Sequence, residues 1–388
     1  MVSTRFPQEI YIIDAVRTPI GSTFKSLKSF SASEIVSVVL KELAARHLQL
    51  KNNIDEIILG NTVSAGSGQN LAREAVIGSG LPVTTPAFLV NSVCGSGLQS
   101  IIMASQAMIA DGLDIIIAGG SESASHCPKI IKEEGKEPID SLIQDGLWCA
   151  ISDKHMGHLA EELAKKNNIS REDQDKFSVE SHKKALAAQQ SGKFTKEIIL
   201  IKLSDGKIFD KDERPRKNIS LERMERLPGA FLENGTVTAG NASAPADGAA
   251  AVILASENAV KKYNLKPKAK ILGYASVALA PELCFEGAVL AAKECLLKCK
   301  LKKEDIDLFE VGESFASQAI FTKQVLNIPD EKMNIYGGDI ALGHPLGSTG
   351  ARMLTTLLSA LEDKKKKIGL VVVCFGSGGA VSVAIERL

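Results

Sequence analysis

The chain has 388 residues, of which 45% are hydrophobic, 24% charged and 5% aromatic. This composition is typical of α/β enzymes, and the length suits two or three packed units. Its 46 Lys and Arg balance 46 Asp and Glu, so no overall field draws it to nucleic acid or to an anionic surface. No apolar run is predicted to be long enough to cross a bilayer, which argues against membrane insertion.

The seven cysteines have no repeated short spacing of the kind that zinc sites use, so we expect free thiols and no bound metal. The N-terminus shows no apolar core of signal-peptide length. The first predicted strand begins at about residue 9, which leaves little room for a transit peptide. These features predict a reducing, cytoplasmic setting.

Short apolar runs rich in β-branched residues alternate with stretches of helical periodicity. This alternation predicts an α/β fold in which helices cover both faces of buried sheets. The predicted strands are 9–16, 54–61, 113–120, 250–256, 269–277, 306–313 and 368–376. The clearest predicted helices between them are 31–47, 97–111, 286–299 and 347–362.

An internal repeat predicts two duplicated α/β halves. The run "IDEIILGN" (54–61) is echoed by "IDLFEVGE" (306–313), and each is followed by a Gly/Ser turn, a helix of small and apolar residues, and a buried strand. We expect an N-terminal half at 1–119 and a C-terminal half at 266–388. Residues 120–245 form an insertion, after which 246–265 return to the first half.

The insertion is charged and carries two amphipathic helices, predicted at 157–166 and 171–191, followed by an irregular stretch. This composition predicts a lid over the core and not a part of the core.

Cys94 lies between an apolar run and Gly95-Ser96-Gly97, which open onto a predicted helix. Unpaired backbone N–H groups and the positive helix end favour the thiolate there, which makes Cys94 a candidate nucleophile. The alternative is that Cys94 fills a small gap in a buried helix, because free cysteine is among the most buried residue types. Cys94 alone does not decide between the two.

Two later loops favour the nucleophile. His344 lies between Gly343 and Pro345 at the start of a helix, in the position of the second half that matches the Cys94 loop. Cys374 ends a buried strand and is followed by glycines, where backbone N–H groups can approach a ligand. Ligands of α/β sheets bind beyond the carboxyl ends of strands, so these loops together predict an enzyme with a nucleophilic cysteine.

Six segments follow one another along the chain: "SVCGSGL", "HMG", "GTVTAGNASAPADGAAA", "ESFASQ", "GGDIALGHPLGSTGAR" and "CFGSGG". In this order and spacing the chain resembles the thiolases, the acetyl-CoA acetyltransferase family, from residue 17 to the C-terminus. The resemblance implies a five-layer αβαβα sandwich. It also implies a dimer or tetramer that acts on coenzyme A thioesters without a bound cofactor, since coenzyme A itself is substrate and product.

By this resemblance Cys94 takes the acetyl group from acetyl-CoA, and His344 assists its deprotonation. Cys374 then removes a proton from a second acetyl-CoA, and the product is acetoacetyl-CoA, or the reverse by thiolysis. The backbone N–H groups of Cys94 and Gly376 form one oxyanion hole. The second hole combines His344 with a water held by an Asn, at the position where this chain has Gly312.

The same resemblance implies the residues that hold coenzyme A. Arg216 matches an arginine that contacts it, and Ser243 matches a serine that bonds its pantetheine arm. His155 and Met156 border the pantetheine and the acyl group, and Phe315 belongs to the "ESFASQ" segment of the pocket. Two further departures from the family pattern are Asp339 in place of Ala, and "ELCFEGAVLA" (282–291) on the acyl side.

Three alternatives remain beside the acetyl-CoA enzyme. A thiolase for other 3-ketoacyl-CoA chains would differ in its acyl pocket. A ketoacyl synthase would have a second histidine, or an asparagine, where this chain has Cys374. A weakly active or non-catalytic coenzyme A-binding relative is suggested by Gly312, but such a protein needs no pair of poised thiols.

Overall fold

A ten-stranded mixed sheet runs through the computed structural model, which describes residues 8–133 and 135–388. Its strands are β1 (Ile10–Arg17), β2 (Gly21–Ser22), β3 (Glu56–Gly60), β4 (Ala87–Val90), β5 (Ile115–Ser123), β12 (Ala246–Ser256), β13 (Ala269–Ala278), β14 (Leu308–Val311), β15 (Ile368–Phe375) and β16 (Gly379–Arg387). They follow the order β14-β15-β16-β13-β1-β12-β5-β3-β4, and β2 pairs with β12. Only two residue pairs, Tyr11 with Lys270 and Ile12 with Ala269, join β1 to β13, so the sheet consists of two half-sheets with a narrow junction.

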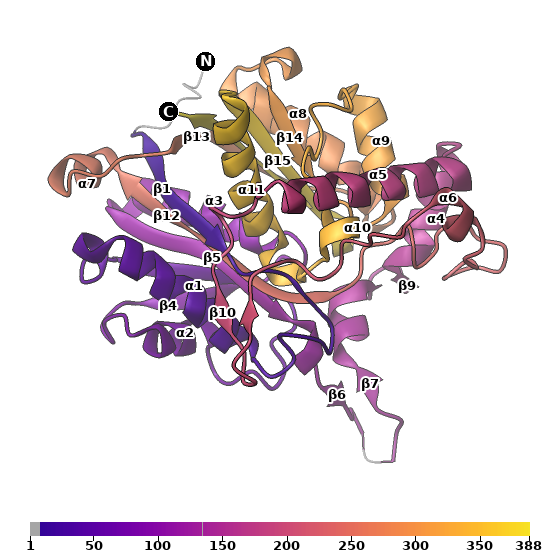
Figure 1. Cartoon of the computed structure of the whole chain (residues 1–388), viewed down its shortest axis with the longest axis horizontal. Coiled ribbons are helices and arrows are strands. Elements are labelled where there is room, and N and C mark those ends of the chain that lie inside the picture. The colour runs from indigo at the N-terminus through magenta and orange to yellow at the C-terminus, as the bar shows by residue number, and fades with distance from the viewer. Residues whose placement is uncertain (1–7, 134) are drawn as a thin grey trace.

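Helices lie on both faces of each half-sheet, so the structure has the five αβαβα layers predicted from the family resemblance (Figure 1). The helices are α1 (Ala32–Arg46), α2 (Leu71–Ser79), α3 (Ser96–Asp111), α7 (Glu257–Lys262), α8 (Gly287–Cys299), α9 (Ala316–Leu326), α10 (Asp339–Leu342) and α11 (Thr349–Lys364). The paired helices α3 and α11 form the middle layer. α1 and α2 cover the outer face of the first half, and α8 covers that of the second.

The period of two along the strands explains this layering. In β3, Ile58 faces the central apolar cluster, whereas Ile57 and Leu59 face the cluster beneath α1 and α2. In β15, Val371 and Val373 face the same central cluster, and the alternate residues face α8. Each strand is therefore apolar on both faces, as the continuous apolar runs in the sequence predicted.

The central position of α3 also accounts for its composition. The stretch Val93–Asp111 is long and apolar enough to cross a membrane by length and composition alone, which the sequence prediction did not anticipate. Most of it is buried between the two half-sheets, as expected of the central helix of a large core. Residues 1–7, on which the prediction about a targeting segment partly rests, lie outside the described residues.

The insertion between β5 and β12 contributes to the core as well as covering it. Its elements are β6 (Lys129–Ile130), β7 (Ile139–Asp140), β8 (Trp148–Cys149), β9 (Lys154–His155), α4 (Met156–Lys166), α5 (Arg171–Gln190), β10 (Ile201–Lys202), β11 (Ile208–Phe209) and α6 (Leu221–Glu225). Four residues of α4, Met156, Leu159, Ala160 and Leu163, belong to the apolar cluster that also contains residues of α8. The charged composition hid this apolar face, so the prediction of a lid without core residues was incomplete.

Candidate active site

A cavity of about 250 Å³ lies where the ends of β4, β14 and β15 meet the insertion. All the site residues predicted from the sequence line it except Gly312 and Arg216. A larger hollow of about 420 Å³ between α5 and α9 is lined mainly by charged residues and contains no cysteine or histidine among its described walls. The smaller cavity is therefore the candidate site. Its predicted lining residues are Cys94, His155, Met156, Ser243, Phe315, His344, Cys374 and Gly376.

A strained turn holds Cys94 between β4 and α3. Val93 has φ 48°, a left-handed conformation that is costly for a β-branched residue, by roughly 1–3 kcal/mol. Hydrogen bonds maintain it: Val93 N–H donates to Asn91 Oδ1 at 2.9 Å, and the Thr62 hydroxyl donates to the Val93 carbonyl at 3.1 Å. Gly95 is required because a Cβ there would lie 2.5 Å from the Phe375 ring. The turn thus directs the Cys94 side chain toward the second half of the molecule.

His344 contacts Cys94 directly, with 3.2 Å between Nε2 and Sγ. Its Nδ1 lies 2.8 Å from the Thr349 hydroxyl, which in turn donates to the Pro345 carbonyl at 3.1 Å. Because that hydroxyl has one proton to give, it accepts from Nδ1–H, and Nε2 is left as the acceptor for the Cys94 thiol. This tautomer makes His344 a base toward Cys94.

Both members of this pair are neutral at rest. Burial raises the pKa of the Cys94 thiol above its usual range, and the carboxylates of Asp339 and Glu122 raise it further. Burial also lowers the pKa of His344. The sequence predicted that the helix end favours the thiolate, and this is wrong for the resting protein because burial outweighs the helix end. In the resting protein the proton therefore stays on the Cys94 sulfur.

Cys374 is the next-to-last residue of β15, with 2% of its surface exposed. Burial raises the pKa of its thiol well above the usual range, and the neighbouring thiols of Cys284 and Cys94 add to this effect. The tight turn that follows needs Gly378, which has φ 89° and whose added Cβ would lie 2.2 Å from the Leu279 carbonyl oxygen. This turn brings Gly376 to the cavity wall opposite Met156.

Aromatic rings form the opposite wall. His155 stacks on Phe231 with 4.8 Å between ring centroids, and Phe315 contacts both Phe231 and Phe285 edge-on. Phe285 lies in "ELCFEGAVLA", the segment that departs from the family pattern and was expected on the acyl side of the pocket. Phe231 was not predicted from the sequence as a site residue. The Ser243 hydroxyl lies on the cavity wall and donates to the Ser314 carbonyl at 3.0 Å.

Two predicted site residues lie outside the cavity. Arg216 is exposed on the irregular part of the insertion, and its backbone N–H donates to Nδ1 of His182 at 3.1 Å. Gly312 follows β14 and donates to the Val372 carbonyl at 3.0 Å. An added Cβ at Gly312 would meet nothing closer than 3.8 Å, so this position has room for a side chain.

Comparison with known proteins supports one family. The model described as "Thiolase, N-terminal domain" matches residues 10–258, and "Thiolase, C-terminal domain" matches residues 265–387. Acetyl-CoA acetyltransferase of Allochromatium vinosum is 42% identical over 392 residues, which covers 98% of this chain and all of the relative.

Solved structures agree with the sequence comparison. Acetyl-CoA acetyltransferase of Bacillus anthracis has a TM-score of 0.96 at 34% identity, with all of both chains covered. Human mitochondrial 3-ketoacyl-CoA thiolase in complex with CoA has a TM-score of 0.95 at 35% identity, with 99% of each chain covered. The two thiols and the imidazole in one cavity agree with this likeness, and we conclude that the chain belongs to the thiolase family.

Proposed function

We propose that this protein condenses two molecules of acetyl-CoA to acetoacetyl-CoA and free CoA, and catalyses the reverse thiolysis, through an acetyl-Cys94 intermediate. Membership of the thiolase family makes the chain an acyltransferase that works on coenzyme A thioesters. The observation that carries the finer proposal is the 3.2 Å contact between Cys94 and His344 in the cavity that Cys374 also lines.

In the first half-reaction Cys94 gives its proton to Nε2 of His344 as its sulfur attacks the thioester carbonyl. The carbon–sulfur bond to coenzyme A then breaks, and the leaving thiolate takes the proton of Cys374. This sequence leaves acetyl-Cys94, a protonated His344 and a Cys374 thiolate. Because burial raises the pKa of Cys374, its thiolate is a stronger base than an ordinary one, which removal of a proton from carbon requires.

In the second half-reaction the Cys374 thiolate removes a proton from the methyl group of a second acetyl-CoA. The enolate oxygen takes a hydrogen bond from Nε2–H of His344, and the carbon attacks acetyl-Cys94 while backbone N–H groups of Cys94 and Gly376 stabilise the tetrahedral oxyanion. Cys94 leaves and recovers its proton from His344. All three groups return to the neutral state in which they began.

The walls of the cavity favour a short acyl chain. Phe231, Phe285 and Phe315 close one side of a space of about 250 Å³ that also receives the thioester. A longer 3-ketoacyl-CoA is the second candidate, because one similar structure is named as a 3-ketoacyl-CoA thiolase. Thiolysis rates for acyl chains of four to sixteen carbons separate the two: kcat/KM falls with length if the aromatic wall limits the chain.

The setting of the reaction follows the family resemblance. We propose a cytoplasmic homodimer or homotetramer that needs no bound cofactor or metal, since both half-reactions use only thiols, an imidazole and backbone donors. His155, Met156 and Ser243 on the cavity wall support a path for the pantetheine arm. Arg216 is proposed to meet the phosphates of coenzyme A outside the cavity, where its exposed side chain is free to reach them.

Two cysteine variants test the assigned roles. Intact-mass measurement after acetyl-CoA is added detects an acetyl group on Cys374→Ala, because this variant can acquire but not use it. Cys94→Ala stays unmodified, and neither variant cleaves acetoacetyl-CoA in the presence of CoA. Cys127→Ala, at a half-buried thiol outside the cavity, serves as the control and retains activity. Equal acetylation of the Cys94 and Cys374 variants would contradict the assignment.

A further inference from the structure

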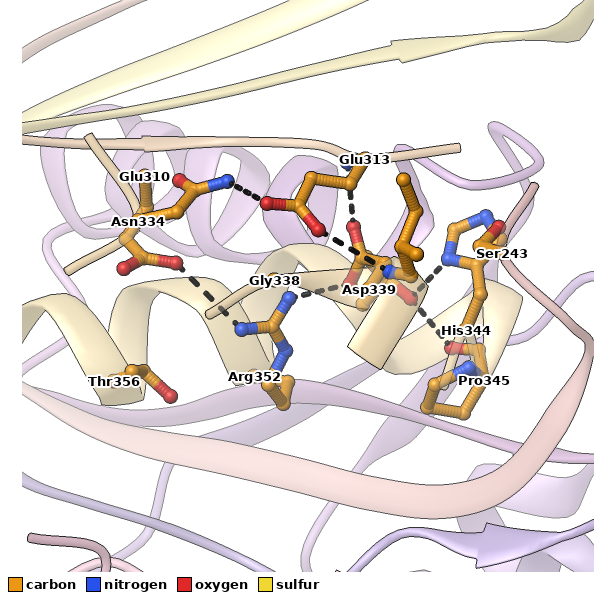
Figure 2. Close-up of polar contacts among 12 residues, drawn as sticks. Ser243, Glu310, Glu313, Asn334, Gly338, Asp339, His344, Pro345, Arg352 and Thr356 are labelled. Atoms are coloured by element: carbon orange, nitrogen blue, oxygen red, sulfur yellow. Dashed lines mark hydrogen bonds and ion pairs between the residues drawn. The ribbon is translucent and has the colours of Figure 1, made fainter. Parts of the chain in front are cut away.

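Asp339 is a buried carboxylate directly behind the catalytic cavity, at a position where the family pattern has alanine. It is fully buried and begins α10, a single turn that ends at Leu342 and is followed by Gly343 and then His344. No step of the proposed reaction uses the Asp339 carboxylate. Figure 2 shows it among a set of polar side chains packed behind the imidazole.

The Asp339 carboxylate connects three elements. One oxygen, Oδ1, forms an ion pair with Nη2 of Arg352 on α11. The other, Oδ2, accepts a hydrogen bond of 2.9 Å from the Glu313 N–H, just after β14. The backbone carbonyl of Asp339 accepts a hydrogen bond of 2.9 Å from Gly343 N–H, which closes the turn of α10.

These contacts bracket the loop that carries His344. Asp339 precedes the loop, and Arg352 lies one turn beyond Thr349, whose hydroxyl holds Nδ1 of the imidazole. The ion pair therefore fixes both ends of the segment between them. Both charged side chains are at most 2% exposed, so solvent does not weaken the pair.

We propose that Asp339 is a positioning residue for His344: it fixes the loop that carries the imidazole, places a buried negative charge behind it, and does so in place of a side chain at position 312. The inference rests on the proposed function only in taking His344 as the base.

The charges around the imidazole agree with this role. The groups that face His344 are Asp339, which raises its pKa against the effect of burial, Arg352, which lowers it, and the Cys94 thiol at Nε2. The groups around Asp339 are Arg352, Glu310 and Glu313. Burial raises the pKa of Glu310 to about 8, so this carboxyl, whose Oε2 lies 3.6 Å from Nη1 of Arg352, is mainly protonated at neutral pH.

Glu313 supports the same turn from the side away from the cavity, where its carboxylate accepts hydrogen bonds of 2.7 Å from Asn334 Nδ2 and from the Ser181 hydroxyl, and one of 3.3 Å from Ile340 N–H on α10. The ion pair with Arg352 at Nη2, however, is made by Asp339. Position 312, by contrast, has room for a side chain and lacks one, and the next peptide N–H donates to Asp339. Asn334 holds the last residue of β14 through both backbone groups of Val311, and Asp339 holds the peptide that follows Gly312.

Four variants test the proposal: Asp339→Asn, Asp339→Ala, Gly312→Asn and the double variant of the last two. For Asp339→Asn, which keeps the shape, we expect kcat for thiolysis to fall about 10-fold or more with KM changed less than about threefold. The acidic limb of the kcat profile moves to lower pH, because His344 loses a negative neighbour. Gly312→Asn raises kcat in the Asp339→Ala background by more than in the wild-type background.

A second readout needs no turnover. Asp339 also raises the pKa of Cys94, so alkylation of Cys94 by iodoacetamide begins at lower pH in Asp339→Asn, as measured by peptide mass mapping. Because alkylation needs no turnover, this measurement tests the inference about Asp339 separately from the proposed function. If Asp339→Ala does not fold because Arg352 lacks its partner, Asp339→Ala/Arg352→Met removes both charges and takes its place.

Asp307→Asn is the matched control. The Asp307 carboxylate accepts two backbone N–H bonds at the start of β15, at the end of the strand far from the cavity. We therefore expect no shift of either pH profile in Asp307→Asn. Wild-type kcat and unshifted profiles in Asp339→Asn would overturn the positioning role. An equal effect of Gly312→Asn in both backgrounds would overturn the exchange between positions 312 and 339.

Discussion

Cys94 and His344 are in hydrogen-bond contact, yet the pair has no charge to attract it at rest. Burial disfavours both the thiolate and the imidazolium, by raising the pKa of one and lowering that of the other. In the proposed reaction, charge separation becomes favourable only when a thioester carbonyl offers an oxyanion to the backbone donors. The same burial that protects the thiols from idle reaction makes Cys374 a strong base once it has lost its proton.

The pH dependence of alkylation tests this neutral pair. Because the pKa of Cys94 is raised, its thiolate fraction is small at neutral pH. We expect its alkylation by iodoacetamide to rise about tenfold per pH unit from pH 7 to beyond 9, without a plateau at low pH. Peptide mass mapping measures the rate at each pH, with the unfolded protein as the reference for an unperturbed thiol. A plateau below pH 7 would instead indicate a stable thiolate–imidazolium pair.

At the scale of elements, glycines allow the loops of the two halves to meet. Three glycines of the first half pack against the carbonyl oxygen of Gly347 in the His344 loop. A Cβ added to Gly60, Gly97 or Gly120 would lie 2.7, 3.0 or 2.0 Å, respectively, from that oxygen. Glu122 completes the contact by accepting from Gly347 N–H at 2.8 Å. The distance between Cys94 and His344 therefore depends on close backbone packing at the ends of β3 and β5.

Gly120→Ala tests this dependence. Its Cβ would overlap the Gly347 carbonyl, so the His344 loop moves and kcat falls by about 10²-fold, at a cost of about 1–3 kcal/mol in the free energy of unfolding. Gly248→Ala is the control on the adjacent strand, because its Cβ meets nothing closer than 3.4 Å. Thiolysis rates and chemical denaturation measure both effects. Equal kcat in the two variants would contradict the argument.

The sequence predicted the elements better than the contacts between them. Apolar runs located the ends of β1, β3, β13 and β15 to within two residues, because strands buried on both faces carry a continuous apolar signal. It did not predict β4, a run of four residues, or α9, which begins inside a motif read for its chemistry. Glycine-bounded strand ends indicated Cys94, His344 and Cys374. The contacts of Asp339 with Glu313 and Arg352 were not predicted, because residues that meet from separate elements leave no local pattern in the sequence.

At the scale of the molecule, the site needs all parts of the chain. Cys94 comes from the first half, His344 and Cys374 come from the second, and the insertion supplies Met156 and Phe231. Arg17, at the end of β1, fastens the insertion to both halves. Its guanidinium bonds Asp212 through two nitrogens and Glu197 through Nε at 2.7 Å, and Glu197 also accepts from Thr356 of α11.

Arg17→Met tests how strongly this network holds the fold. The variant leaves two carboxylates buried without their cation, so we expect the free energy of unfolding to fall by roughly 3–5 kcal/mol. Arg17→Lys should not restore it, because an ammonium cannot match the two-pronged contact with Asp212. Lys207→Met removes one partner of an exposed ion pair in the same insertion and leaves the thermal midpoint unchanged. If Arg17→Met were as stable as Lys207→Met, the buried charges would make no net contribution to stability. Packing alone would then hold the insertion against the two halves.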